Sequence, residues 1–252
     1  MEIIYIVFIF IIGCIFGSFF NVVGYRVPNE LSIVRPGSFC PKCKHSLRWY
    51  ELIPIFSFLI QKGKCRDCKE KISIIYPVVE LTTGILFVSS YLIFGFSNQF
   101  LVALLVSSFT MIVIVSDINY LIIPDEITLF FCIFMFVVKL ATEGVEQSIL
   151  ALLSGVFMFA FMYFIMKLGN FIFKKESLGG GDVKLMFFVG LTIGPILGMF
   201  SIFLSSLIAL PLSLFVFLKD NDNVIPFGPF ILIATFAIIL FGIEASNILG
   251  LF

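Results

Sequence analysis

Two aspartates lie at positions where a charged side chain is costly. Asp117 follows the apolar run 109–116, and Asp182 follows three glycines and precedes another apolar run. A carboxylate at the border of a membrane is expensive to keep, so its presence points to a function. Each aspartate also adjoins a flexible or helix-breaking segment. The pair therefore suggests acid–base chemistry on a substrate that is held in a membrane.

The other side chains of the sequence limit the kinds of catalytic site that the chain can form. The chain has one histidine, His45, which argues against His-based metalloprotease sites and against Ser-His-Asp or Cys-His nucleophiles. A Ser-Lys pair stays open on composition, although no Ser and Lys stand out together. Two carboxyl groups, one protonated and one ionised, can activate water as in aspartic peptidases. The glycines before Asp182 would let a substrate backbone approach it closely; they are Gly179, Gly180 and Gly181.

Asp125 is a third candidate carboxylate. Asp117 and Asp125 bracket the segment 118–124, which would suit a shared site. Asp125 and Glu126 are also typical of the first turn of a helix, where carboxylates suit the helix dipole. We therefore favour a helix-start or site-supporting role for Asp125 over catalysis. Asp182 could likewise be only a helix cap after its glycine loop, and the residues alone leave both alternatives open.

Four cysteines form two CxxC pairs in a basic segment, Cys40 with Cys43 and Cys65 with Cys68. Two such pairs resemble a zinc ribbon, because each CxxC turn can aim two thiolates at one tetrahedral ion. Disulfides or idle thiols are the alternatives, and a reducing cytoplasm argues against disulfides. Four thiolates complete the coordination shell, so we expect a structural zinc site.

The remaining cysteines and the histidine receive plainer interpretations. Cys14 and Cys132 lie inside apolar runs and are expected to pack in the core. His45 follows Cys43 closely and could be a spare ligand or a surface residue. The surface interpretation is favoured, because four thiolates already complete the zinc shell.

The composition predicts a polytopic membrane protein. Hydrophobic residues make up 60% of the 252 residues, and the mean hydropathy is +1.16. Charged residues make up 13%, about half the usual share of a soluble domain. The first apolar run lacks a basic n-region and a small-residue cleavage site, so we expect a retained span rather than a signal peptide. The net charge of zero gives no sign of a nucleic-acid partner.

The apolar runs predict an all-α membrane bundle of about eight transmembrane helices. They cover 3–23, 74–94, 99–116, 123–141, 148–168, 183–195, 197–218 and 228–250. Gly194-Pro195 divides a longer run, because Pro breaks the helical hydrogen bonding and Gly permits a bend. If Met1 lies outside, every Lys and Arg except Lys139 falls on the cytoplasmic side, as the positive-inside rule favours. Asp117 and Asp182 then share one depth at the cytoplasmic face.

Several segments of the chain, taken in order, resemble those of the type IV prepilin peptidases, membrane aspartic peptidases with a GxGD motif. The similar segments are 17–26, 35–43, 62–68, 74–81, 117–125, 179–182 and 225–229. The resemblance implies that Asp117 and Asp182 are catalytic. It also implies three regions: a first transmembrane helix over 1–23, a cytoplasmic tetracysteine loop over 24–73 and a transmembrane peptidase core over 74–252.

The same resemblance implies a substrate and a second activity. The substrates would be precursors of type IV pilins and pseudopilins, cut after a Gly at the cytoplasmic face of the bacterial inner membrane. Members with the tetracysteine loop commonly also N-methylate the new N-terminal residue with S-adenosylmethionine. No residues of this sequence mark a methyl-donor site, and neither the particular pilin nor the oligomeric state follows from the sequence.

Two other functions compete with this interpretation. A transporter or channel could use Asp117, Asp182 and Glu80 as intramembrane carboxylates, but this would leave the cysteine loop unexplained. A membrane scaffold could dock an assembly machine through its zinc ribbon without catalysis. Alanine substitution of either aspartate separates the three, because only a peptidase would lose precursor cleavage while it stays folded.

Overall fold

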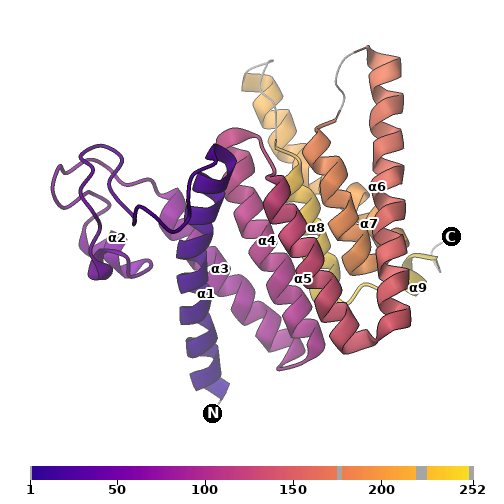
Figure 1. The fold of residues 1–252 in the computed structure, drawn as a ribbon, viewed down its shortest axis with the longest axis horizontal. Coiled ribbons are helices and arrows are strands. Elements are labelled where there is room, and N and C mark those ends of the chain that lie inside the picture. The colour runs from indigo at the N-terminus through magenta and orange to yellow at the C-terminus, as the bar shows by residue number, and fades with distance from the viewer. Residues whose placement is uncertain (1, 175–177, 220–225, 250–252) are drawn as a thin grey trace. The chain divides into compact units, whose positions relative to one another are not determined.

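The computed structural model describes residues 2–174, 178–219 and 226–249, and within these ranges the chain is helical with no β-strand (Figure 1). The predicted all-α class is confirmed. The chain divides into two compact units, residues 1–96 and 97–252. The predicted regions 1–23, 24–73 and 74–252 are successive segments of the chain. The two compact units are instead groups of helices that pack together, so they do not test the predicted regions.

The first unit is built on two helices that approach closely, α1 (Glu2–Arg26) and α3 (Ile75–Phe94). A Cβ added to Gly13 would lie 2.7 Å from the Cα of Gly84. A Cβ at Gly17, one turn further, would also lie within 2.7 Å of the α3 backbone. Small residues spaced four apart let two membrane helices pack backbone to backbone.

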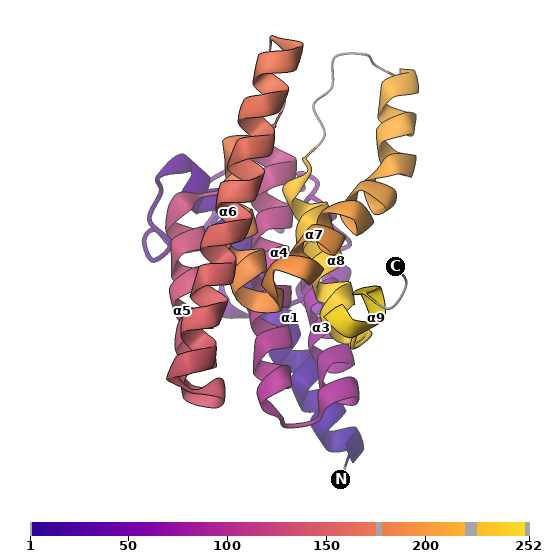
Figure 2. The same ribbon diagram turned by 90° about the vertical axis from the view of Figure 1, so that its right-hand side faces the viewer.

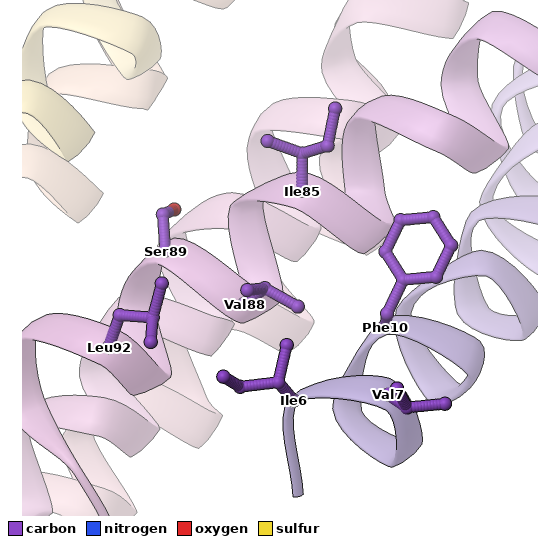
Figure 3. A pocket seen from close by; sticks show the side chains of 7 residues that line it. All are labelled: Ile6, Val7, Phe10, Ile85, Val88, Ser89 and Leu92. Atoms are coloured by element: carbon purple, nitrogen blue, oxygen red, sulfur yellow. The ribbon is translucent and has the colours of Figure 1, made fainter. Parts of the chain in front are cut away.

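An apolar groove runs between these two helices (Figure 3). Its volume is about 350 Å³ and its lining is almost wholly apolar. The lining residues are Ile6, Val7, Phe10, Ile85, Val88, Ser89 and Leu92. All of them belong to helices long and apolar enough to cross a membrane, so ordinary lipid chains suffice to fill the groove.

The segment between α1 and α3 contains three short helices, η1 (Val27–Asn29), η2 (Trp49–Glu51) and α2 (Phe56–Ile60). The guanidinium of Arg26, the last residue of α1, ties down the start of this loop. It donates hydrogen bonds to the backbone oxygens of Ser32, Pro36 and Gly37 at 2.9, 2.8 and 3.2 Å. The loop is therefore held to the end of the helix that precedes it.

The second unit holds the remaining helices. They are α4 (Asn98–Tyr120), α5 (Asp125–Glu143), α6 (Val145–Phe173), α7 (Gly180–Lys219), α8 (Gly228–Leu240) and α9 (Ala245–Leu249). Phe109 on α4 is fully buried, and its ring stacks on Phe131 of α5 and meets Phe188 of α7 edge-on. Such aromatic pairs stabilise the core by about 0.5–1.5 kcal/mol beyond the area they bury. The core therefore joins the helices that carry the two aspartates.

The long helix α7 bends where the sequence predicts a turn. Gly194 has φ +78° and ψ 177°, outside the helical region, and Pro195 follows it. Figure 2 shows the chain turning back there, so that the second limb returns toward the end at which the first limb begins. Glycine adopts this backbone conformation at little cost, and proline cannot donate to the preceding turn.

The predicted final span over 228–250 is wrong in its length. Helix α8 ends at Leu240, because Gly242 takes φ +61° and the chain closes a Schellman turn. In that turn the N–H of Ile243 donates to the oxygen of Ile238 at 3.1 Å. Thirteen helical residues span about 20 Å, short of a membrane core of about 30 Å.

The predicted number of eight spans is not confirmed. Five helices among the described residues are long and apolar enough to cross a membrane: Glu2–Asn29, Ile75–Phe94, Asn98–Tyr120, Val145–Phe173 and Gly180–Phe215. The fifth contains the bend at Gly194, so it covers two of the predicted spans. Helix α5 carries Asp125 and Glu126 in its first turn and lies outside this set.

Candidate functional site

Asp117 lies in the last turn of α4 and is 6% exposed. The helix ends three residues later, and Leu121 takes the left-handed conformation, its N–H donating to the backbone oxygen of Asp117 at 2.9 Å. The short connection that follows brings Ile123, which is buried, against the same region. Asp117 is therefore a buried carboxylate at a helix end, as its position after an apolar run predicts.

Asp182 lies in the first turn of α7 and is partly buried. The two aspartates converge on Gly228, the first residue of α8. A Cβ added to Gly228 would lie 3.3 Å from Oδ2 of Asp117 and 3.3 Å from Oδ1 of Asp182. The two oxygens are thus separated by at most twice that distance. The structure brings together the two residues that the sequence singled out.

Gly228 shapes this convergence because it has no side chain. Its backbone N–H donates to the carboxylate of Asp117. An added Cβ would also meet Cδ1 of Ile123 at 2.6 Å. The pair therefore lies among the end of α4 and the starts of α7 and α8, and helix N-termini favour negative charge. Such a site can hold one ionised and one protonated carboxyl group close together.

The three glycines before Asp182 differ in their surroundings. Gly179 and Gly180 are exposed, and a Cβ added to Gly180 would meet nothing within 4 Å. A Cβ added to Gly179 would lie 3.4 Å from Oδ2 of Asp182, whereas Gly181 faces Ile123. Open space beside Asp182 is compatible with the close approach of a substrate backbone, which stays a prediction.

Asp125 is not part of the convergent pair. It is the first residue of α5 and follows Pro124, the N-cap residue. Both of its carboxylate oxygens lie 2.7 Å from Nζ of Lys184 on α7, and both side chains are largely exposed. Asp125 thus links the start of α5 to the start of α7, through a lysine that is two residues from Asp182 along the chain.

The four cysteines of the loop form one cluster. Their sulfurs all lie within 4.8 Å of one another, with Cys40–Cys68 at 3.8 Å and Cys43–Cys65 at 3.9 Å. Around a tetrahedral zinc with Zn–S bonds of about 2.3 Å, neighbouring sulfurs lie about 3.8 Å apart. The donor set and its spacing therefore fit a zinc ion, and four protein ligands leave no position for catalysis.

Each CxxC pair sits in a turn of the same form. In the first, the N–H of Lys44 donates to the oxygen of Cys40 at 2.9 Å, and Lys44 has φ +60°. In the second, the N–H of Lys69 donates to the oxygen of Cys65 at 3.1 Å, and Lys69 also has φ +60°. Isolated antiparallel bridges flank both turns. Equivalent turns present the two pairs to one point.

The thiols of the cluster differ in acidity. The pKa of Cys40 is lowered to about 7, chiefly because the backbone N–H of Cys43 donates to its sulfur. For Cys68 a hydrogen bond at the backbone of Glu70 lowers the pKa, but burial and the neighbouring thiols together raise it to about 12. The Cys40 thiol is therefore partly ionised near neutral pH, and the thiolate is the form that ligates a metal.

His45 connects the two halves of the loop, which corrects the surface interpretation. Its side chain is 17% exposed, with Nε2 3.2 Å from Glu51 and Nδ1 2.9 Å from Asp67. Hydrogen bonds from the backbone N–H of Arg48 and from His45 hold the pKa of Glu51 below its ordinary value. Because Asp67 lies between Cys65 and Cys68, His45 fastens the second CxxC turn to the first.

Two interior cysteines confirm their predicted packing role, since Cys14 and Cys132 are buried. Sequence reasoning missed the part played by Gly228. It lies in the segment 225–229 that contributed to the resemblance, but its spacing carries no sign of a contact with residues far away in the chain. Only the packing of α8 against α4 and α7 reveals it.

Two family models match successive parts of the chain. Residues 11–94 match the bacterial peptidase A24 N-terminal domain, and residues 104–214 match the type IV leader peptidase family. These two matches fall in the first and the second compact unit respectively. No solved structure matches the chain.

Curated relatives agree with these matches. The prepilin leader peptidase/N-methyltransferase of Bacillus subtilis is 39% identical over 186 residues, which cover 74% of this chain and 73% of that protein. The enzyme of the same name from Vibrio cholerae is 33% identical over 261 residues, 97% and 99% of the two chains. That from Pseudomonas aeruginosa is 30% identical, over 94% and 90%. The chain therefore belongs to the type IV leader peptidase family.

Proposed function

We propose that this protein removes the leader of type IV prepilins and pseudopilins with Asp117 and Asp182 as its catalytic pair. The observation that carries the proposal is the convergence of both carboxylates on Gly228, each 3.3 Å from the position of an added Cβ. Three of its relatives carry the name prepilin leader peptidase/N-methyltransferase. A transporter or a scaffold is not favoured, because neither needs two carboxylates beside an open glycine backbone.

In this mechanism the two carboxyl groups share one proton. The ionised group takes a proton from a water molecule, which attacks the scissile carbonyl, while the protonated group donates to the carbonyl oxygen. The Gly228 N–H suits Asp117 as the ionised partner, since a hydrogen bond from an amide favours a carboxylate. The resulting tetrahedral intermediate collapses as the leaving nitrogen receives a proton, which frees the new N-terminal amine.

The five apolar helices and the family indicate an integral membrane protein. We further propose the bacterial inner membrane, with the catalytic pair at the cytoplasmic face. The support for this orientation is the distribution of Lys and Arg: ten lie within residues 24–73 and four within residues 167–184. A leader on the cytoplasmic side would then meet both aspartates at the border of the bilayer.

The second activity we propose is N-methylation of the product. The relatives' names support a methyl transfer, and S-adenosylmethionine would be the donor. The zinc that Cys40, Cys43, Cys65 and Cys68 would hold supplies no chemistry to either step, because its shell is closed. Its task would be to keep the loop folded.

One experiment tests the peptidase. The purified protein is mixed with a prepilin and an isotopically labelled methyl donor, and the products are analysed by mass. Asp117→Asn and Asp182→Asn should each lower cleavage by at least about 1,000-fold, since each removes one of the two proton-transferring groups. Asp125→Asn is the matched control and should keep most activity. Full cleavage by either dyad variant would refute the mechanism.

A second experiment separates the two activities. A pre-cleaved pilin with a free N-terminal amine is offered to the Asp182→Asn variant, and transfer of the labelled methyl group is measured. Transfer should match that of the unchanged protein, because the amine already exists. No transfer by the unchanged protein would limit this chain to peptidase activity. Loss in the variant alone would mean that the two sites overlap.

A further inference from the structure

The loop between α1 and α3 exposes apolar side chains outside every candidate membrane span. Within residues 49–60, which we call the apolar segment, six such residues face outward. Their exposed fractions are 78% for Trp49, 40% for Leu52, 40% for Ile53, 66% for Phe56, 63% for Leu59 and 80% for Ile60. None of them belongs to a helix long enough to cross a membrane. Contiguous apolar surface of this kind marks an interaction site.

These side chains are not scattered. Successive members are three, one, three, three and one residues apart along the chain. The residues between them turn the other way: Glu51 is buried, and Ser57 and Phe58 are partly buried. Residues 52–55 separate η2 from α2, and the exposed apolar side chains come from η2, from this turn and from α2.

The apolar segment is fastened to a membrane-spanning helix. The backbone N–H of Ile55 donates to Oε2 of Glu80 on α3 at 2.7 Å. Ile55 takes φ +62°, a conformation that a β-branched residue rarely adopts and that persists only when its surroundings impose it. Glu80 is the sixth residue of α3, so the attachment point lies about 7.5 Å along that helix from Ile75.

Measured from the start of α3, this distance is comparable to the depth at which interfacial helices lie. Interfacial helices place their apolar face about 5–10 Å into the boundary between headgroups and acyl chains. Figure 1 shows the loop to the side of α1, level with the C-terminal half of that helix, rather than beyond its end. The helix α2 of the apolar segment thus lies beside α1 and not beyond its end.

The ends of the apolar segment suit lipid headgroups. Arg48 precedes it and Lys62 follows it, and both side chains are exposed. Basic side chains and tryptophan collect at the interface, where a charged or polar end can reach water and the apolar part reaches lipid. The positive charge at both ends complements anionic lipids.

We propose that the apolar segment is an interfacial anchor, which inserts its outward face into the anionic leaflet on the side where α3 begins. The groove of Figure 3 differs, because its lining belongs to the spans themselves. The anchor would hold the cysteine loop flat against the membrane through Glu80, rather than leave it free in water. The inference does not depend on the peptidase activity.

The chain's only tryptophan makes this testable by fluorescence in the full-length protein. The protein is reconstituted in vesicles of phosphatidylcholine and phosphatidylglycerol whose acyl chains are brominated, and acrylamide serves as the aqueous quencher. In a Trp49→Phe background, single reporters are introduced as Phe56→Trp and Ile60→Trp. Glu70→Trp is the matched control, because Glu70 is an exposed side chain of the second CxxC turn.

The brominated lipids should quench the reporters at 56 and 60 at least about threefold more than the control, which acrylamide should quench instead. Equal exposure of all three to acrylamide would overturn the proposal. Shielding of 56 and 60 from both quenchers would also overturn it, and would mean that a protein surface covers the segment. Should a reporter variant misfold, as judged by its thermal unfolding, the same comparison is made with native Trp49, which is 78% exposed.

Discussion

The cysteine cluster and the carboxylate pair are built in opposite ways. All four sulfurs come from two turns of one loop, and each turn is closed by its own backbone hydrogen bonds, as at Cys40 and Cys65. The carboxylates come from the end of α4 and the start of α7, and they meet at the start of α8. A site made of local turns is specified by a short motif, whereas a site made of helix ends depends on how whole helices pack.

Among changes outside the two carboxylates themselves, the largest expected effect follows from adding side-chain atoms at Gly228. Gly228→Ala would place a methyl group 3.3 Å from an oxygen of each aspartate, and Gly228→Val would add two more carbons there. A displacement of about 1 Å in such a site can cost about 100-fold in rate. We expect cleavage to fall in the order Gly, Ala, Val, with a loss of at least about 100-fold for Val, measured as kcat/KM on a prepilin.

Gly37→Ala is the control for this series, since an added Cβ there meets nothing within 4 Å and Gly37 lies in the loop of the first unit. Its activity should stay close to that of the unchanged protein. Unchanged cleavage by Gly228→Val would mean that the carboxylate pair is not the catalytic site. The comparison between a site of local turns and a site of helix ends would then no longer hold.

Local patterns predicted much of this molecule. The two CxxC turns, the helices around the aspartates and the bend at Gly194 all follow from residue types within a few positions of one another. Helix propensity and turn chemistry act over this range, so a sequence displays them directly. The distribution of Lys and Arg predicted that Asp117 and Asp182 lie at the same depth in the membrane. The convergence of the two carboxylates in the structure agrees with this prediction.

What the sequence could not supply depends on contacts between distant residues. His45 lies against Asp67 because two turns of the loop fold together, and the spacing of these residues in the sequence does not predict that contact. Gly228 reaches both carboxylates through the packing of three helices. The early end of α8 was missed for a different reason: Gly242 sits in an apolar run, where composition alone favours a continuous span.

The next effect concerns the cysteine cluster itself. Cys40→Ser removes one of four ligands and should lower zinc affinity by at least about 100-fold, because even residues around a metal's ligands contribute 10–100-fold. Residues 27–74 should then exchange amide hydrogens faster, and protein yield should fall. Cleavage per folded molecule should change little. A parallel loss of zinc and of catalytic rate would show that the two regions are not independent.

A smaller effect is expected where α6 and α7 touch. A Cβ added to Gly190 would lie 2.5 Å from the backbone oxygen of Ser154 and 2.8 Å from the side chain of Met158. Since the backbone must shift, Gly190→Ala should destabilise the second unit by about 1–3 kcal/mol. Thermal unfolding in detergent measures this, and Gly37→Ala is again the control. Zinc content should not change, because the cysteine cluster does not depend on the contact between α6 and α7.

The smallest effect belongs to the ion pair of Asp125 and Lys184, which joins the starts of α5 and α7. Both side chains are largely exposed, and such pairs contribute about 0–1 kcal/mol. Asp125→Asn and Lys184→Met should each lower stability by less than about 1 kcal/mol, and the double variant should lose no more than the larger single effect.

The catalytic readout decides whether this pair matters beyond stability. Lys184 is two residues from Asp182, so on a helix the two side chains point to nearly opposite sides, and losing the Lys184 partner leaves the Asp182 carboxylate in place. We therefore expect kcat within about threefold of the unchanged protein for both single variants. A loss as large as that of Asp182→Asn would instead assign Asp125 to the reacting group. The carboxylate site would then include a third helix start, held by a surface contact rather than by the buried core.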